Sequence, residues 1–247
     1  MMNSVIYQLE ASFDRVLASL TQNLHADEQF TLRLQGEVSQ FTRFNHAKVR
    51  QTGIVRDSSL QLKLISQQRS SSVEFPLTGD LEFDLPQALA MLESLRVEVP
   101  QLPIDPYLVT PLGDATSREV HGGKLLPDAE VVGTLLPVVN DLDFTGLYAG
   151  GMVLRGYADS NGQKHWFATE SYTLDYSLFT QTGQAVKGTL AGSHWDTIAY
   201  QAKITESKTQ LARLLQPLKT IERGKYRTYL APAATADLLG MLSWGAI

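Results

Sequence analysis

The stretch TLRLQGEV, residues 31–38, decides the fold class, because apolar and polar side chains alternate along it. Leu32, Leu34 and Val38 occupy every second position, and the positions between them are polar. A period of two is typical of a strand with one buried face and one solvated face. The same pattern returns in LQLKL (60–64) and in YTLDYSLF (172–179), so the sequence predicts antiparallel sheet in both halves of the chain.

Helical periodicity lies on either side of these strands. Apolar residues recur at three- and four-residue steps in four segments, at 5–24, 86–95, 129–140 and 197–218. The order of helix, strands and helix therefore occurs twice along the chain. We predict an α+β fold in which antiparallel sheets are flanked by helices, built from two similar helix–strands–helix units.

A segment rich in proline and glycine lies between the two units. We therefore expect a first unit at 1–100, a connector at 101–127, and a second unit at 128–247 that ends in an apolar helix. The connector contains enough apolar residues that it is expected to lie against the surface and not to be a free tether.

Several local signals predict turns. Asp57-Ser58 and the polar residues 69–72 are expected to connect strands. Asn161-Gly162 predicts a hairpin with a type I′ turn, in which both residues have positive φ. The glycines between Gly146 and Gly151 fit no phosphate-binding spacing, and they are expected to allow close packing or a bulge.

Composition excludes several classes of function. The 247 residues include 26 acidic and 21 basic side chains, for a net charge of -5, and no cysteine. Disulfides and thiol catalysis are thereby excluded, and the lack of a basic stripe argues against direct binding of nucleic acid. No apolar run approaches the roughly 20 residues needed to span a bilayer. The N-terminus also lacks a basic segment followed by an apolar core, so we expect no membrane association and a cytoplasmic location.

The catalytic inventory is small. The five histidines, at 25, 46, 121, 165 and 194, never fall four residues apart on one helix face, so no local metal site is expected. Ser193 and His194 are adjacent, and we expect their side chains to point apart on a strand. No Gly-x-Ser-x-Gly elbow occurs in the chain. The sequence therefore gives no catalytic residue, no metal ligand and no cofactor.

Four segments together resemble the TldD/PmbA family, also called modulators of DNA gyrase and related to peptidases. Each segment is similar to a family motif, and the segments follow one another in the family's order and spacing. The resemblance covers about 200 residues and is carried by RFN with Val49 and Gln51 (43–51), YADSNG (157–162), AGSHWD (191–196), and the run from Gly224 through YLAP (229–232) to ADLL (236–239).

The resemblance also defines what this chain lacks. Peptidase members of the family carry a His-Glu-x-x-x-His helix directly after the double leucine, where the histidines bind zinc and the glutamate acts as general base. The three corresponding positions are Gly240, Met241 and Gly245. The resemblance therefore implies a zinc-motif-lacking type, and only its N-terminal region, since family members continue into a strand-rich C-terminal domain.

The last ten residues are apolar and uncharged. We expect an interface there, made by Leu239, Leu242, Trp244 and Ile247 and covered by the rest of a longer protein or by another subunit. The alternative is that this helix packs on the preceding sheet.

The leading hypothesis is a non-catalytic, N-terminal region of a TldD/PmbA-type protein in intracellular proteolysis or peptide maturation, contributing to peptide access and to a homo- or heterodimer with a TldD/PmbA-type subunit. Arg43, Asn45 and Gln51 are the candidate peptide contacts, by strand addition. As an alternative, they form the polar face of a solvated sheet, with Asn45 in a turn. Two other functions stay open: a free-standing protein-interaction module and, less favoured, a metallopeptidase in its own right.

Overall fold

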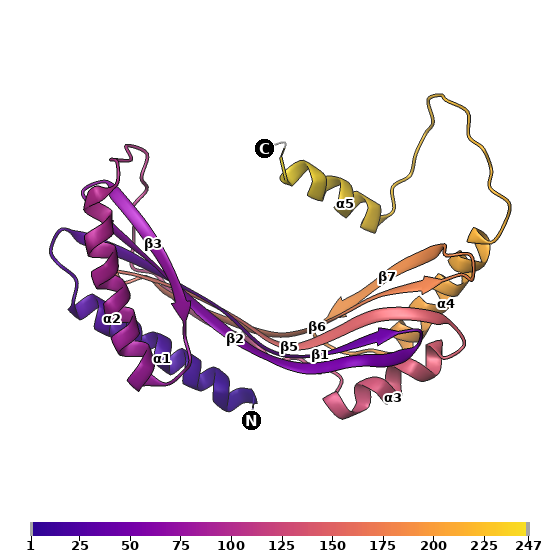
Figure 1. The fold of residues 1–247 in the computed structure, drawn as a ribbon, viewed down its shortest axis with the longest axis horizontal. Coiled ribbons are helices and arrows are strands. Elements are labelled where there is room, and N and C mark those ends of the chain that lie inside the picture. The colour runs from indigo at the N-terminus through magenta and orange to yellow at the C-terminus, as the bar shows by residue number, and fades with distance from the viewer. Residues whose placement is uncertain (1, 246–247) are drawn as a thin grey trace. The chain divides into compact units, whose positions relative to one another are not determined.

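The computed structural model describes residues 2–245. Residues up to Leu215 form one compact unit, and residues from Gln216 onward form a second. The elements, most of which are labelled in Figure 1, are the helices α1 (Met2–Gln22), α2 (Leu81–Glu98), α3 (Asp128–Val139), α4 (Thr197–Leu214) and α5 (Pro232–Ser243), the 3₁₀ helix η1 (Val99–Gln101), and the strands β1 (Glu28–Asn45), β2 (Lys48–Ser66), β3 (Arg69–Pro76), β4 (Thr116–His121), β5 (Asp143–Asp159), β6 (Lys164–Phe179) and β7 (Ala185–Gly192).

All strands of the first unit belong to one sheet. Its order is β3-β2-β1-β5-β6-β4, and β7 also pairs with β6, beyond the end of β4. Every pairing is antiparallel except that of β4 with β6. The predicted α+β class is confirmed, but the expectation of separate sheets is wrong, because β1 pairs with β5 along residues 31–44 and joins the two halves. The division into domains stays a prediction.

One face of this sheet is buried under two helix pairs, except along residues 48–58 of β2. The alternating side chains predicted for the strands all point to it, and α1 and α2 cover one half while α3 and α4 cover the other (Figure 1). Apart from Gly151 and Asp159, the buried positions of the three central strands are even-numbered, and they include Phe30, Leu32, Leu34, Phe44, Phe144, Tyr148, Leu154, Trp166, Leu174 and Tyr176. The opposite, odd-numbered face carries no helix of the first unit.

Each helix pair closes its own hydrophobic cluster. The cluster under α1 and α2 is mainly aliphatic and includes Leu60, Leu62 and Leu64 of β2. The cluster under α3 and α4 is rich in tyrosine, with Tyr148 and Tyr200 fully buried. Burying one large apolar side chain stabilises the fold by roughly 1.5–3 kcal/mol, so both clusters contribute strongly.

Two of the hairpin turns lie where the sequence did not indicate them. His46-Ala47 joins β1 to β2 and Gln67-Gln68 joins β2 to β3, each with positive φ at both residues, as a type I′ turn requires. The expected connections at 57–58 and 69–72 are wrong, since these residues lie inside β2 and β3. Strand pairing with β5 holds the first turn, where Asp143 Oδ1 lies 2.7 Å from His46 Nδ1.

Two further local expectations are corrected. At Asn161-Gly162 only Gly162 has positive φ, so this turn is not of type I′. The strand indicated by the alternation at 172–179 begins earlier, at Lys164, because β6 pairs with β5 without interruption. The expected close packing of glycine is present at Gly151, where a Cβ would overlap the carbonyl oxygen of Val38 and the Cα of Ser39.

Candidate peptide-binding surface

The three residues predicted to contact peptide lie together on the helix-free face. Arg43 of β1 pairs directly with Gln51 of β2, and Asn45 follows two positions after Arg43 on the same face. Asn45 is the last residue of β1 and directly precedes the turn at His46-Ala47. The structure thus brings the three side chains to the end of one strand pair.

These three side chains differ in what they already contact. Asn45 accepts a hydrogen bond from Thr145 Oγ1 at 3.0 Å, which ties β1 to β5. The guanidinium of Arg43 lies 5.7 Å from the centroid of the Phe41 ring, and the side chain is otherwise exposed. Gln51 is exposed too. Asn45 therefore has a structural contact, while Arg43 and Gln51 face solvent.

The first half of β2 is an open edge. β3 pairs with Ser59–Ser66, and a final hydrogen bond joins the Leu77 amide to the Ser58 carbonyl at 2.9 Å. In the described part of the chain, residues 48–58 pair with β1 alone. Because backbone groups alternate in direction along a strand, Thr52, Ile54 and Arg56 present their N–H and C=O groups to the same open side as Ser58.

A buried carboxylate fixes the point where β3 leaves this edge. Asp84, only 1% exposed, accepts hydrogen bonds from the amides of Thr78 and Gly79, each at 2.9 Å. Its carboxylate also accepts from Ser12 Oγ at 2.6 Å and from Thr78 Oγ1 at 2.9 Å. These bonds turn the chain away from β2 and into α2, with Gly79 at a φ of +84°. Residues 48–58 are left without a second neighbour.

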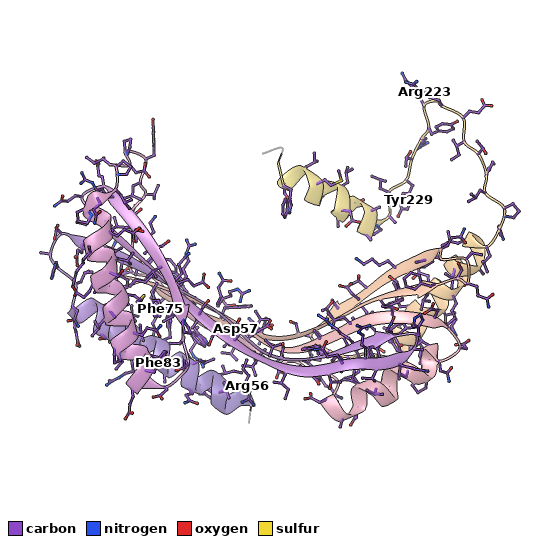
Figure 2. All side chains as sticks on the ribbon, viewed as in Figure 1. Arg56, Asp57, Phe75, Phe83, Arg223 and Tyr229 are labelled. Atoms are coloured by element: carbon purple, nitrogen blue, oxygen red, sulfur yellow. The ribbon has the colours of Figure 1, made fainter. Side chains whose placement is uncertain are left out.

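Positive charge gathers along the open edge of an otherwise acidic chain. Residues 48–58 contain Lys48, Arg50 and Arg56 against a single acidic residue, Asp57. Arg56 and Asp57 leave the strand on opposite faces, Arg56 on the helix side (Figure 2). β2 has a β-bulge opposite Arg43 and Phe44, and Arg50 is its extra residue. The open edge therefore carries an excess of positive charge.

Small residues hollow the middle of the helix-free face. Ser39 pairs with Gly151, and Gly151 with Ser171, so one row across three strands carries almost no side-chain volume. The hollow has a volume of about 400 Å³ and is also lined by Ala149 and Ala191. It lies one row beyond Phe41, between the predicted peptide contacts and the other half of the sheet.

The titratable groups show no catalytic arrangement. No group of three histidine, aspartate or glutamate side chains comes together as a metal site within residues 2–245. Ser193 Oγ lies 3.0 Å from His194 Nδ1, so the expectation that these two side chains point apart is wrong. His194 forms no ion pair with a carboxylate in the part of the chain that the structure describes. The pair thus lacks the third group that orients a base.

The buried tyrosines under α3 and α4 belong to the hydrophobic core. Burial raises the pKa of Tyr148 to about 12 and also raises the pKa of Tyr200 and Tyr176. Tyr200 donates to the Leu135 carbonyl at 2.9 Å, and the hydroxyls of Tyr176 and Ser207 lie 2.8 Å apart. These hydroxyls stay neutral and connect α3, α4 and β6.

The predicted interface residues lie on or next to α5, in the second unit. Leu239, Leu242 and Trp244 are exposed, and α5 buries no residue. Ile247 lies outside the described residues. The interface stays a prediction.

Across the part of the chain described, no helix is long and apolar enough to cross a membrane.

Comparison with known proteins identifies the fold. No family model matches the chain, and no curated protein matches it in sequence. Several solved structures are similar to the chain, three of which follow. A proposed modulator of DNA gyrase from Bacteroides thetaiotaomicron has 14% identity and a TM-score of 0.69, covering 95% of this chain and 56% of its own.

The other two structures agree with the first. A proposed modulator of a DNA gyrase from Thermotoga maritima has 12% identity and a TM-score of 0.59, covering 87% of this chain and 50% of its own. TldE from Thermococcus kodakarensis has 9% identity and a TM-score of 0.58, covering 81% and 47%. The chain spans about half the length of the structures it matches.

The chain is therefore an α+β protein in which one long sheet carries two helix pairs on a single face. That fold is the one found in the TldD/PmbA-type structures, and the resemblance seen in the sequence motifs is confirmed at the level of the fold.

Proposed function

We propose that this chain is the non-catalytic, N-terminal region of a TldD/PmbA-type protein that acts in intracellular, cytoplasmic proteolysis or peptide maturation. Its role is to receive extended peptide, while the chemistry belongs to another part of the protein or to another subunit. The observation that carries the proposal is the open edge at residues 48–58, beside Arg43 and Gln51. An added strand there gains main-chain hydrogen bonds regardless of its sequence.

The edge gives an experiment on the proposed function. A fluorescein-labelled peptide, Thr-Val-Thr-Leu-Thr-Val-Thr, is titrated with the full chain, and binding is followed by anisotropy. Ile54→Pro removes an outward-facing N–H without touching the bonds to β1, so we expect binding at least tenfold weaker. The same peptide with alternate N-methyl groups is the matched control and is expected not to bind.

The side-chain contacts are tested separately. Arg43→Ala and Gln51→Ala are each expected to weaken binding by about two- to fivefold, since these are exposed contacts at the edge of the site. Unchanged binding in both variants would remove Arg43 and Gln51 from the site but would leave the edge. Unchanged binding in Ile54→Pro would refute strand addition itself.

A role in dimerisation rests on the exposed apolar side chains of the second unit. Leu239, Leu242 and Trp244 present large apolar groups, and Trp244 is 93% exposed. Large exposed apolar side chains gathered in one short segment are a feature of interaction surfaces. Light scattering of the full chain is expected to give a dimer, and Leu242→Glu with Trp244→Glu to give a monomer. A wild-type monomer would contradict this part of the proposal.

A second function has its own support. The same exposed residues fit a free-standing interaction module whose C-terminal helix docks a partner protein. The peptide experiment separates the two functions, because a module of that kind needs α5 and not the edge of β2. A metallopeptidase in its own right has no ligand set that supports it among the residues described.

A further inference from the structure

A groove crosses the helix-covered face between the two helix pairs. Val5 of α1 stands on one side, and residues 123–128 before and at the start of α3 stand on the other. Val38, Gln40 and Gly150 of the sheet form its floor. The volume is about 550 Å³, enough for one or two large side chains.

The groove opens onto the free edge of β2. Ile54 and Arg56 line it, and both belong to the segment that pairs with β1 alone. The side chain of Ile54 is 65% exposed although it points toward the covered face, because neither helix pair reaches it. A strand added to this edge would place every second side chain on the groove side.

The lining combines apolar surface with charged side chains. Val5, Val38, Ile54, Leu126 and Pro127 supply the apolar part.

Arg56 and Lys124 bring two positive charges to the groove, and Asp128 and Glu170 bring two negative charges. The carboxylate of Glu170 also accepts a hydrogen bond from the Gly123 amide at 2.6 Å. The groove lining is therefore balanced, and the excess of positive charge comes from the edge, where Lys48, Arg50 and Arg56 stand against one acidic residue.

We propose that the edge and the groove form one site for an acidic, extended peptide. The backbone of the peptide pairs with Thr52, Ile54 and Arg56. One of its apolar side chains enters the groove beside Val38 and Leu126. Its carboxylates approach Arg56 and Lys124, and also Lys48 and Arg50 farther along the edge. This inference rests on the proposed function and adds the class of peptide to it.

Charge argues against a second copy of this chain as the occupant. Antiparallel pairing of two β2 edges about a two-fold axis brings Lys48, Arg50 and Arg56 of one copy next to the same three residues of the other. Such a contact concentrates six cations against two aspartates, and like charges on paired strands are destabilising. An acidic strand meets no such repulsion.

The test uses three labelled peptides and the full chain. The acidic probe is Glu-Val-Glu-Leu-Glu-Val-Glu, the basic probe replaces each Glu with Lys, and the third probe replaces the central Leu of the acidic one with Ser. At low salt we expect the acidic probe to bind at least tenfold more tightly than the basic probe. The Leu-to-Ser change is expected to weaken binding about tenfold, because the groove then loses its apolar occupant.

Variants locate the effect on the protein. Arg56→Glu is expected to weaken binding of the acidic probe at least tenfold and to restore part of the binding of the basic probe. Lys63→Glu is the matched control, because Lys63 lies in the half of β2 that β3 covers, and it should change affinity less than twofold. Equal loss in both variants would overturn the proposal, since it would indicate general attraction by charge.

The outcomes also separate this inference from the proposed function. Equal affinity for acidic and basic probes, with Ile54→Pro still abolishing binding, would overturn the acidic preference and leave strand addition standing. No binding of any probe would refute the proposed function and the inference with it. A dimer by light scattering that Ile54→Pro dissociates would show that a second copy occupies the edge, contrary to the inference.

Discussion

The two halves of β2 belong to one strand and share one partner, β1, yet they have opposite surroundings. In Ser59–Ser66 the strand lies between β1 and β3, and Leu60, Leu62 and Leu64 are buried under α1 and α2. In Lys48–Ser58 it has one neighbour, and most side chains are exposed. The comparison teaches that pairing alone does not bury a strand. A second neighbour and a covering helix are both needed.

The sequence of each half matches its surroundings. LQLKL (60–64) alternates apolar and polar residues, as a strand with one buried face requires. KVRQTGIVRDS (48–58) has no such alternation and carries three basic residues. Lysine and arginine on an edge oppose uncontrolled pairing with other chains. On the proposal made above, the open half of β2 therefore selects which strands can pair with it.

The strongest contrast is expected from Leu62→Ala in the covered half. Leu62 is fully buried, so the substitution should lower the free energy of unfolding by about 4 kcal/mol, through lost burial and the cavity left behind. Denaturant unfolding of the full chain measures it. Gln61→Ala, one residue away on the other face, is the control and should cost less than about 1 kcal/mol. Equal effects would contradict the assignment of faces.

The next largest effect concerns the boundary between the halves. Asp84→Ala removes the carboxylate that accepts from the amides of Thr78 and Gly79, leaving donors without partners and costing about 3 kcal/mol. Hydrogen exchange should also show faster exchange of the Leu77 amide, whose bond to Ser58 is the last one before the open edge. Asp80→Ala, at the exposed N-cap of α2, is expected to cost about 1 kcal/mol and to leave that amide protected.

A third, smaller effect lies at the far end of the covered half. Glu28 pairs with Ser66, and its carboxylate binds Arg96 through two bonds of 2.8 and 2.7 Å. Burial by itself raises the pKa of Glu28, but the hydrogen bonds from Arg96 and from the His25 backbone, together with the charges of these two residues, outweigh burial and hold that pKa below its usual 4.5. Glu28→Gln should therefore cost about 2 kcal/mol at neutral pH.

The direction of this pKa shift determines how the stability of the fold changes with pH. Because the pKa of Glu28 is lowered on folding, its stabilisation is complete above about pH 4.5 and is lost as the pH falls through the lowered value. Stability curves of the wild type and of Glu28→Gln should thus converge in acid. A constant gap down to about pH 3 would show that the charge of Glu28 is not responsible.

The smallest effect is expected in the open half. Ile54→Ser should change stability by less than about 0.5 kcal/mol, because its side chain is already mostly in solvent. Thermal unfolding measures it. A loss above about 1.5 kcal/mol would indicate that something in the folded chain covers this edge, and the contrast between the two halves would fail.

Much of the fold could be predicted because alternation is a local property. The stripes at 31–38, 60–64 and 172–179 all face the core as expected. The turns at His46-Ala47 and Gln67-Gln68 could not be predicted, because neither pair carries the glycine or asparagine that favours positive φ. The register with neighbouring strands imposes these turns, and the strand simply continues through Asp57-Ser58, where the residues suggested a break.

The candidate site was predicted only in part. Arg43, Asn45 and Gln51 came from motif resemblance, and they do lie on one face of adjacent strands. The open edge and the groove were not predicted, since the edge exists only because Asp84 directs β3 away from β2. The signal that could have indicated the open edge is the presence of basic residues in a strand without alternation, at 48–58.

The sequence by itself determined which side chains face inward, where the helices lie and which chemistry is missing, because periodicity and residue type act over a few neighbouring positions. Only the tertiary structure decided that the two halves share one sheet, that the four α-helices of the first unit cover the same face, and that half of β2 pairs with β1 alone. Those features depend on long-range register and on one buried carboxylate, and contacts between distant residues leave no mark on local sequence pattern.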